Sequence, residues 1–324
     1  MNVLFVRLAR FGALLALTVV MLGAWVRLTD AGLGCPDWPG CYGRLVVPHP
    51  ATTADELGAD YTRPLEAGKA WREMIHRYLA STLGFVCLAL AAIAWRNRRD
   101  SAQPRRAPYV LVGLVVFQGL LGMWTVTLLL KPIVVVAHLL GGLATLALLA
   151  SLGRWRSARL PAAGPALRAL GVGAAAALLL QIALGGWTSA NYAALACADF
   201  PTCQTQWWPA LADFGEGFVL WRGLGIDYEG GVLDHPARVA VHFTHRLGAL
   251  LAALLVAWLG WRLAREPATR PDGVAVLALL LLQLSLGVSI VWLGVPLAVA
   301  VAHNGTAALL LLAVINANQR IRQR

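Results

Sequence analysis

The chain has 324 residues, of which 59% are hydrophobic and 13% charged, a composition far from that of an average soluble domain. Its formal net charge of +11 comes from 27 lysines and arginines set against 16 acidic residues. These basic residues gather in short connections between apolar runs, and no phosphate-binding glycine loop or RNA-binding aromatic pattern is visible, so membrane topology explains the charge better than nucleic acid does. The composition indicates an integral membrane protein.

Eight apolar runs are long enough to cross a bilayer core, which needs about 20 residues as helix. They predict an all-α, polytopic membrane fold with helices near 9–27, 72–95, 107–129, 132–152, 169–189, 237–261, 272–293 and 296–317. Arg7 and Arg10 before the first run are also typical of a cleavable signal peptide. However, the segment 22–25 (Leu-Gly-Ala-Trp) recurs at 184–187 (Leu-Gly-Gly-Trp), so we expect the first run to be a retained helix.

Arginines mark one side of the predicted path. They follow the second, fourth and sixth runs and occupy the C-terminal tail, at Arg96, Arg98, Arg99, Arg105, Arg106, Arg154, Arg156, Arg159, Arg168, Arg262, Arg265, Arg270, Arg320, Arg322 and Arg324. By the positive-inside rule the N- and C-termini are predicted to be cytoplasmic. The two long loops, near 28–71 and 190–236, are then expected outside.

The second half of the chain repeats the chemistry of the first. Each half has a Cys-x5-Cys pair in its long loop, then a His-Arg dipeptide, then a histidine twenty residues after a glutamine. The two sets are Cys35, Cys41, His76, Arg77, Gln118 and His138, and Cys197, Cys203, His245, Arg246, Gln283 and His303. Because each unit has an even number of spans, both copies insert in the same orientation. We therefore predict two pseudo-symmetric four-helix bundles, at 1–153 and 169–324.

The four repeated histidines are expected at a similar depth in one leaflet, about 10 Å below the surface at 1.5 Å per residue, with His76 a little shallower. Polar groups at that depth are costly and usually functional. Zinc normally takes three or four protein ligands, whereas porphyrin iron needs two axial ligands from facing helices. We predict that His76 pairs with His138, and His245 with His303, as axial ligands of haem iron. For any one histidine alone, a hydrogen bond to a neighbouring helix is the alternative.

Residues next to these ligands leave several interpretations open. Arg77 and Arg246 each follow a ligand by one position, about 100° around the helix. They are candidates for binding haem propionates, for reaching toward lipid headgroups and for bonding a neighbouring helix. Eight glycines fit the close approach of a flat cofactor, but each fits ordinary packing of small residues between helices equally well: Gly84, Gly119, Gly122, Gly141, Gly142, Gly248, Gly287 and Gly305.

The cysteines are predicted to form two disulfides, Cys35–Cys41 and Cys197–Cys203, because both short loops lie on the oxidising side. One interpretation is a staple that folds each loop as a lid over its haem pocket, and we favour it for the second pair. The other is a redox-active pair that exchanges electrons or thiols. For Cys35 and Cys41 both interpretations stay open, so these residues are candidate catalytic groups.

The repeats differ at one informative position. Aligning the two His-Arg dipeptides places Glu73 opposite His242, each three residues before its predicted ligand and so on the same helix face. A carboxylate beside a membrane haem can take or give protons, which makes Glu73 a candidate catalytic residue and the first unit the predicted site of chemistry. The alternative for Glu73 is a headgroup-level charge paired with Arg72 or Arg77.

These residues resemble the haem A synthase family, comprising the bacterial CtaA and mitochondrial COX15-type proteins. The resemblance covers the whole chain and includes Glu-Met-Ile-His-Arg at 73–77, Val-Ala-His at 136–138, Thr-His-Arg at 244–246 and Ala-His-Asn at 302–304. It implies an oxidoreductase that converts the C8 methyl of haem O to the formyl of haem A for cytochrome oxidase. Successive hydroxylations would use molecular oxygen and electrons delivered from outside the protein.

The resemblance also implies roles for the two units. Glu73, His76 and His138 would hold the substrate haem, while His245 and His303 would hold a haem b cofactor. Candidate partners are a haem O synthase, a quinol or ferredoxin-like electron donor and a second copy of the chain, all at a bacterial inner (cytoplasmic) membrane. An iron with two histidine ligands has no position for oxygen, so either one ligand of the first unit moves away or the oxidant is generated differently.

Two functions from other classes remain as alternatives. A dihaem b-type electron carrier, from quinol to an outside acceptor, needs the four histidines but has no special use for one asymmetric glutamate. A membrane thiol-disulfide oxidoreductase would use the cysteine pairs, and its histidines would only pack.

Overall fold

The computed structural model describes residues 2–50, 52, 61, 63–154 and 164–322. Over these residues the fold is all-helical, apart from isolated bridges beside each cysteine pair, as the sequence predicts. Arg156, Arg159 and Arg324, three of the arginines that define the predicted topology, lie outside the described residues.

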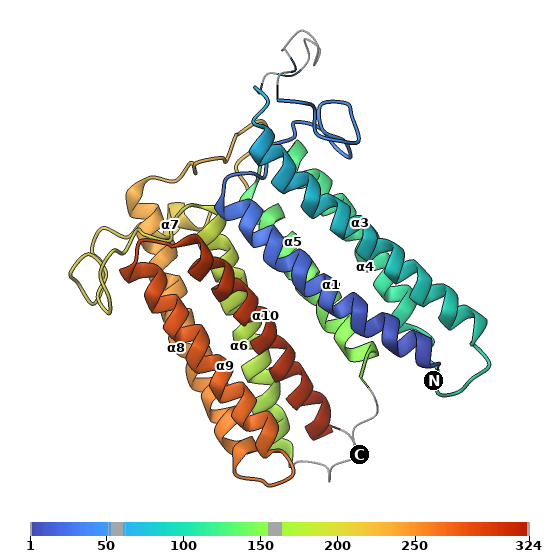
Figure 1. Ribbon diagram of the computed structural model, residues 1–324. Helices are drawn as coiled ribbons and strands as arrows, with labels where there is room; N and C mark the ends of the chain where they lie inside the picture. Colours follow the sequence, from blue (N-terminus) through green and yellow to red (C-terminus); the bar gives the residue numbers. More distant parts are fainter. Residues whose placement is uncertain (1, 51, 53–60, 62, 155–163, 323–324) are drawn as a thin grey trace. The chain divides into compact units, whose positions relative to one another are not determined.

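The helices are labelled in Figure 1. They are α1 (Val3–Leu28), α3 (Ala67–Arg96), α4 (Ala107–Thr127), α5 (Pro132–Leu152), α6 (Pro165–Ala190), α7 (Phe214–Gly217), α8 (His235–Ala264), α9 (Arg270–Trp292) and α10 (Leu297–Arg322). Eight of them are long and apolar enough to cross a membrane, and only the one-turn α7 is not, so the predicted set of spans is confirmed.

Several helices extend past the apolar runs that predict them. α1 begins at Val3 and not near residue 9, because the Asn2 side chain accepts a hydrogen bond from the Leu4 amide. α8 begins at His235, where the Asp234 side chain accepts from the Ala237 amide. An apolar run marks only the part of a helix that lies in the bilayer, whereas the helical hydrogen bonds continue until a cap satisfies the free amides.

The described chain divides into two compact units. The first unit comprises Met1–Gly153 and Leu220–Val232, and the second comprises Arg154–Val219 and Leu233–Arg324. The functions assigned above to the two halves stay predictions. In each unit the long loop lies at one end of the helices, which we call the loop end.

The helices of each unit are connected by the same pattern of packing. In the first unit, α1 and α4 each pack on both α3 and α5. In the second unit, α6 and α9 each pack on both α8 and α10. The pairs α3 with α5 and α8 with α10 are therefore diagonal across their bundles, separated by the other two helices. These are the helices that carry the four repeated histidines.

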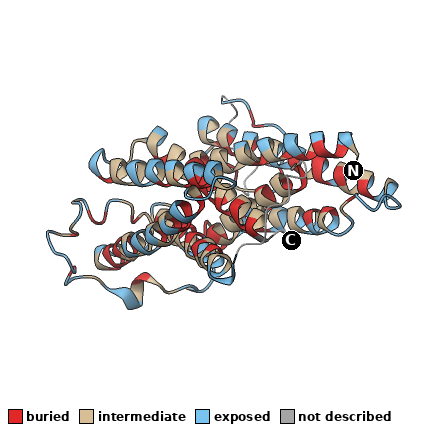
Figure 2. Ribbon diagram, turned by 90° about the horizontal axis from the view of Figure 1, so that it is seen from below, coloured by how far each residue is buried: buried red, intermediate tan, exposed pale blue. Residues whose placement is uncertain are grey.

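Figure 2 shows buried and exposed positions on different faces of the helices, and many of the exposed residues are large and apolar, such as Phe85, Leu254 and Leu281. Within the apolar windows of the spans, the buried share ranges from 11% in α9 to 39% in α10. A soluble protein with so much exposed apolar surface would aggregate, so these faces suit contact with lipid.

Two glycines offer a test of the packing in the second unit. A Cβ added at Gly273 in α9 would lie 2.3 Å from the Ala264 backbone nitrogen in the α8 region, whereas one added at Gly173 in α6 would meet no atom within 4 Å. We expect Gly273→Ala to destabilise the protein by about 1–3 kcal/mol through overpacking. Gly173→Ala, the control, should leave stability unchanged. Thermal unfolding of the detergent-solubilised protein measures both, and equal melting temperatures would contradict this account of the α8–α9 contact.

Candidate functional site

The repeated histidines form two pairs across the diagonals of their bundles. His76 on α3 lies close enough to His138 on α5 for the imidazoles to interact electrostatically, and His245 on α8 stands in the same relation to His303 on α10. Since these helix pairs do not pack directly on each other, each pair of imidazoles brackets the interior of one bundle. This is the arrangement that two axial ligands of one flat group require.

Each of these imidazoles lies against a glycine of a neighbouring helix. A Cβ added to that glycine would come within 3.1 to 3.6 Å of the ring carbon Cε1, so at Gly23, Gly185 and Gly287 the ring would have to shift, while at Gly122 the Cβ would be in ordinary contact with it. The pairs are Gly23 with His76, Gly122 with His138, Gly185 with His245, and Gly287 with His303. Sequence reasoning proposed Gly122 and Gly287 but missed Gly23 and Gly185. The repeated Leu-Gly-x-Trp segment contains both of these glycines, and its recurrence in the two halves is the sequence signal that could have identified them.

The imidazoles carry unsatisfied polar atoms. The Nδ1 atoms of His76, His138 and His303 are buried and have no hydrogen-bond partner. A buried polar atom without a partner is costly and calls for an explanation such as a bound group. Among the described residues, no three His, Cys, Asp or Glu side chains gather as a closed metal site. The paired imidazoles with their glycine-lined surroundings fit haem, which needs two protein ligands and a flat space, better than zinc.

A glutamine lies beside the histidine pair of the second unit. Gln283 Nε2 is 3.1 Å from His303 Nε2, so the twenty-residue spacing between them brings the side chains together across the α9–α10 turn. Gln181 on α6 donates to the His245 carbonyl at 3.0 Å, and its Nε2 also lies 3.0 Å from His245 Nδ1. These amides hold the rings of the second unit in place.

Both cysteine pairs form disulfides, with Cα–Cα distances of 4.8 Å for Cys35–Cys41 and 4.7 Å for Cys197–Cys203. All four cysteines are buried. Because thiol exchange requires access to the sulfur atoms, a soluble thiol could react with either pair only after its loop opens.

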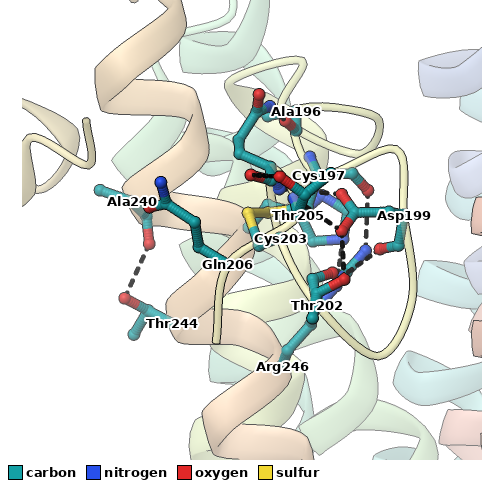
Figure 3. The surroundings of a disulfide bond; sticks show 12 residues. Ala196, Cys197, Asp199, Thr202, Cys203, Thr205, Gln206, Ala240, Thr244 and Arg246 are labelled. Carbon is teal, nitrogen blue, oxygen red and sulfur yellow. Dashed lines mark hydrogen bonds between the residues drawn. A yellow bond between two sulfur atoms is a disulfide. The ribbon is translucent and has the colours of Figure 1, made fainter. Parts of the chain in front are cut away.

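An aspartate inside each disulfide loop closes the turn that follows the second cysteine. Asp37 accepts hydrogen bonds from the amides of Tyr42, at 2.6 Å, and Gly43, at 2.8 Å. Asp199 accepts from the amides of Gln204, at 2.8 Å, and Thr205, at 3.0 Å (Figure 3). Burial alone would raise the pKa of Asp199, but its hydrogen bonds from Thr202 and these amides lower it below the usual value. The Cys-x-Asp pattern thus has a local structural purpose in both loops.

The two arginines that follow the first ligand of each unit hold these loops. Arg77 donates to the carbonyls of Asp37, at 2.9 Å, and Gly40, at 2.5 Å. Arg246 donates to the carbonyls of Cys197 and Asp199, both at 2.7 Å. The sequence leaves three interpretations of these arginines open, and the structure shows a contact that is none of them, with the disulfide loop. A bond to haem propionates stays a prediction. Each loop is tied to the helix turn that carries the first repeated histidine of its unit.

Glu73 and His242 occupy the same place beneath the two loops but differ in what they can accept. Glu73 Oε2 accepts from the Cys35 amide at 2.9 Å, while its Oε1 pairs with Arg77. His242 lies between the Cys197 amide, 3.2 Å from Nδ1, and Arg246, whose Nε is 3.3 Å from Nε2. A carboxylate accepts both bonds at once, whereas a neutral imidazole has a single acceptor nitrogen. The first loop is therefore anchored by a fully satisfied charged network and the second is not.

Comparisons with known proteins show the family of this chain. A family model described as cytochrome oxidase assembly protein, COX15-CtaA, matches residues 7–315. The chain is 43% identical over 318 residues to a protein of Shewanella oneidensis named heme A synthase, covering 96% of this chain and 94% of that one. It is 31% identical over 334 residues to a protein of the same name from Rhizorhabdus wittichii, covering 94% and 90%. A third relative with that name, from Halalkalibacterium halodurans, is 29% identical over 299 residues.

The glycines against the imidazoles allow each site to be tested separately. We expect Gly23→Val to displace His76 and remove haem from the first unit only, and Gly185→Val to displace His245 and remove it from the second only. Gly113→Val is the control, because a Cβ at Gly113 meets no atom within 4 Å. Haem content and absorption spectra of the purified variants measure the loss. Full haem content in both site variants would show that these glycines do not shape the sites.

Proposed function

Since the chain belongs to the cytochrome oxidase assembly protein family, COX15-CtaA, we propose that it is a haem A synthase, the name its curated relatives carry. The observation that carries the proposal is the pair of histidines on diagonal helices, present once in each unit. One pair of histidines in each unit suits an enzyme whose substrate is itself a haem and which needs a second haem as cofactor. A membrane setting also suits haem O, whose tail is apolar.

The proposed reaction is the oxidation of the C8 methyl of haem O to a formyl group. Two successive hydroxylations account for the product. Each consumes one molecule of oxygen, two electrons and two protons, and each releases one water. The geminal diol formed by the second hydroxylation loses water to give the aldehyde. A complete turnover therefore takes four electrons and four protons from outside the substrate.

We assign the substrate to the first unit, between His76 and His138, and a haem b cofactor to the second, between His245 and His303. The support for this order is the difference between Glu73 and His242, because only the first unit places a carboxylate one turn from a ligand. A haem b held by His245 and His303 would supply electron transfer there. In this proposal the second unit binds haem b and transfers electrons, while the first unit binds haem O and carries out its oxidation.

Glu73 has two roles in this proposal. Its bonds to the Cys35 amide and to Arg77 position the first loop beside the turn that carries His76. A carboxylate has about four acceptor sites, and these two bonds leave others for a water or the oxidised methyl group. Glu73 can therefore hold a proton at the reacting edge without releasing the loop.

The electrons must reach the sites from a donor outside the protein, for which a quinol or a ferredoxin-like protein is the candidate class. The Cys35–Cys41 disulfide is the candidate relay, since a disulfide takes two electrons and two protons to become two thiols. Its burial means that a donor must meet an opened loop or a membrane-borne reductant. A purely structural role for the same pair remains the competing proposal.

We further propose that the loop ends of both units face outward and that both termini are cytoplasmic, in the inner membrane of a bacterium. The arginines at Arg96, Arg98, Arg105 and Arg106, and at Arg262, Arg265 and Arg270, support this orientation, because they all lie at the end opposite the long loops. A haem O synthase and a second copy of this chain are the proposed protein partners.

Pigment extraction tests the proposed function. Purified protein from cells that supply haem O should yield haem O or haem A beside haem b. Haem b alone would favour the dihaem electron carrier, and protein without haem would contradict both proposals.

Variants at Glu73 test its assigned role. We expect Glu73→Ala to retain haem but to stop haem A formation, and Glu73→Gln, which keeps the acceptor for the Cys35 amide, to retain the loop yet lose most activity. His242→Ala is the matched control at the equivalent position and should keep substantial product yield. The measurement is the haem A yield per bound haem of each variant, obtained by chromatography of extracted pigment. A normal yield from Glu73→Ala would overturn the assignment.

A further inference from the structure

One segment of the second long loop packs within the first unit. We call Leu220–Val232 the strap. In the sequence it lies between Val219 and Leu233, both of which belong to the second unit. The strap can be followed in Figure 1 as the yellow-orange stretch that runs past the loop ends of α1 and α3.

The strap holds the residue from which α5 begins. Lys131 caps α5 and its side chain is 2% exposed. Its ammonium group donates to the carbonyl of Gly223 and lies 3.6 Å from the ring centroid of Trp221. A buried ammonium is costly unless it is paired, so this carbonyl and this aromatic face fix the strap to the start of α5. His138 follows seven residues later on the same helix.

The strap also holds the segment that leads into α3. Arg63, four residues before Ala67, donates to Glu229 at 2.5 Å and pairs with Asp227. The Arg63 carbonyl in turn accepts from the hydroxyl of Tyr42, at 3.2 Å, which follows Cys41 in the first disulfide loop. The strap is thus linked to the helix that carries Glu73 and His76.

Between these two attachments, Tyr228 enters the apolar cluster at the loop end of the unit. It is 3% exposed and packs with Leu33, Val126 and Leu130. Its amide donates to the Leu129 carbonyl at 3.0 Å. Tyr228 therefore contacts the turn between α4 and α5 through both its ring and its backbone.

That turn has an unfavourable backbone. Leu129 and Leu130 have φ values of 49° and 60°, in the left-handed region that favours glycine. The equivalent turn between α9 and α10 places Gly294, at φ 69°, where the first unit has Leu129. Leu130 and its counterpart Val295, at φ 59°, are left-handed in both turns, so the difference is Leu129, and the contacts of the strap help to hold that residue in its conformation.

From these contacts we infer that the strap is a clamp that fixes the separation of α3 and α5 at the loop end of the first unit. These two diagonal helices do not pack on each other, and the strap attaches to the lead-in of both. Arg63, Lys131 and Tyr228 are then positioning residues for His76 and His138. The inference rests on the proposed function only in assigning those histidines to the substrate haem.

Amide exchange of the full-length protein tests the clamp directly. The amides of Leu129, Leu130 and Lys131 are each hydrogen bonded within the turn, as are those of Gly294 and Val295 in the equivalent turn. We expect Tyr228→Ala to speed exchange at 129–131 by roughly tenfold or more through local opening, and to leave 294–295 unchanged. Adding Leu129→Gly to Tyr228→Ala should restore slow exchange, because glycine adopts the left-handed conformation unaided.

A second variant keeps the test decisive if Tyr228→Ala does not fold. Asp227→Asn combined with Glu229→Gln removes only the charge contacts of the strap with Arg63, and it should speed exchange at 63–70 relative to the wild type. It should also lower haem A yield while the second-unit haem spectrum stays unchanged. Unaltered exchange in both variants, or equal acceleration at 129–131 and 294–295, would overturn the clamp. Absence of haem A from the wild type would instead contradict the proposed function and leave the exchange result standing.

Discussion

The structure depends on one constraint, which is that a polar group inside a bilayer must find a partner within the protein. The two imidazoles of a pair lie on diagonal helices, which do not pack against each other. The other two helices of the bundle separate them. Glycines let the rings approach the flanking helices, yet three Nδ1 atoms remain without a hydrogen bond. Paired imidazoles on diagonal helices, each against a glycine, form an arrangement that would suit a flat group such as haem.

The same constraint explains why the two copies have diverged. The disulfide loop of each unit turns its carbonyls toward an arginine and its first cysteine amide toward the residue four positions earlier on the helix. A carboxylate serves the amide and the arginine together, whereas an imidazole serves only one of them. One unit thus holds a carboxylate fixed by two bonds, and the other holds a ring that can accept only one. This difference of one residue is what supports the proposed division of roles between the units.

Much of the fold could be predicted from the sequence, because the length of apolar runs and the duplication are both one-dimensional signals. The eight spans and the Cys, His and His order needed no knowledge of contacts. The features that could not be predicted depend on contacts between residues that are distant in the sequence. Gly23 and Gly185 matter only because a particular ring lies against them, and Glu73 gains its loop contact from a cysteine 38 residues away. The strap was beyond prediction because its partners, such as Lys131, are roughly ninety residues distant and carry no repeating pattern.

The origin of the strap has a consequence for biogenesis. A nascent membrane protein emerges from the ribosome N-terminal end first, and its domains tend to fold in that order. The first four spans cannot complete their loop end in this way, since the segment that ties α3 to α5 is synthesised only after α6 has entered the membrane. Until then the loop end of the first unit lacks the clamp between α3 and α5. The interval provides a stage of synthesis at which the two helices that carry His76 and His138 can still separate at that end.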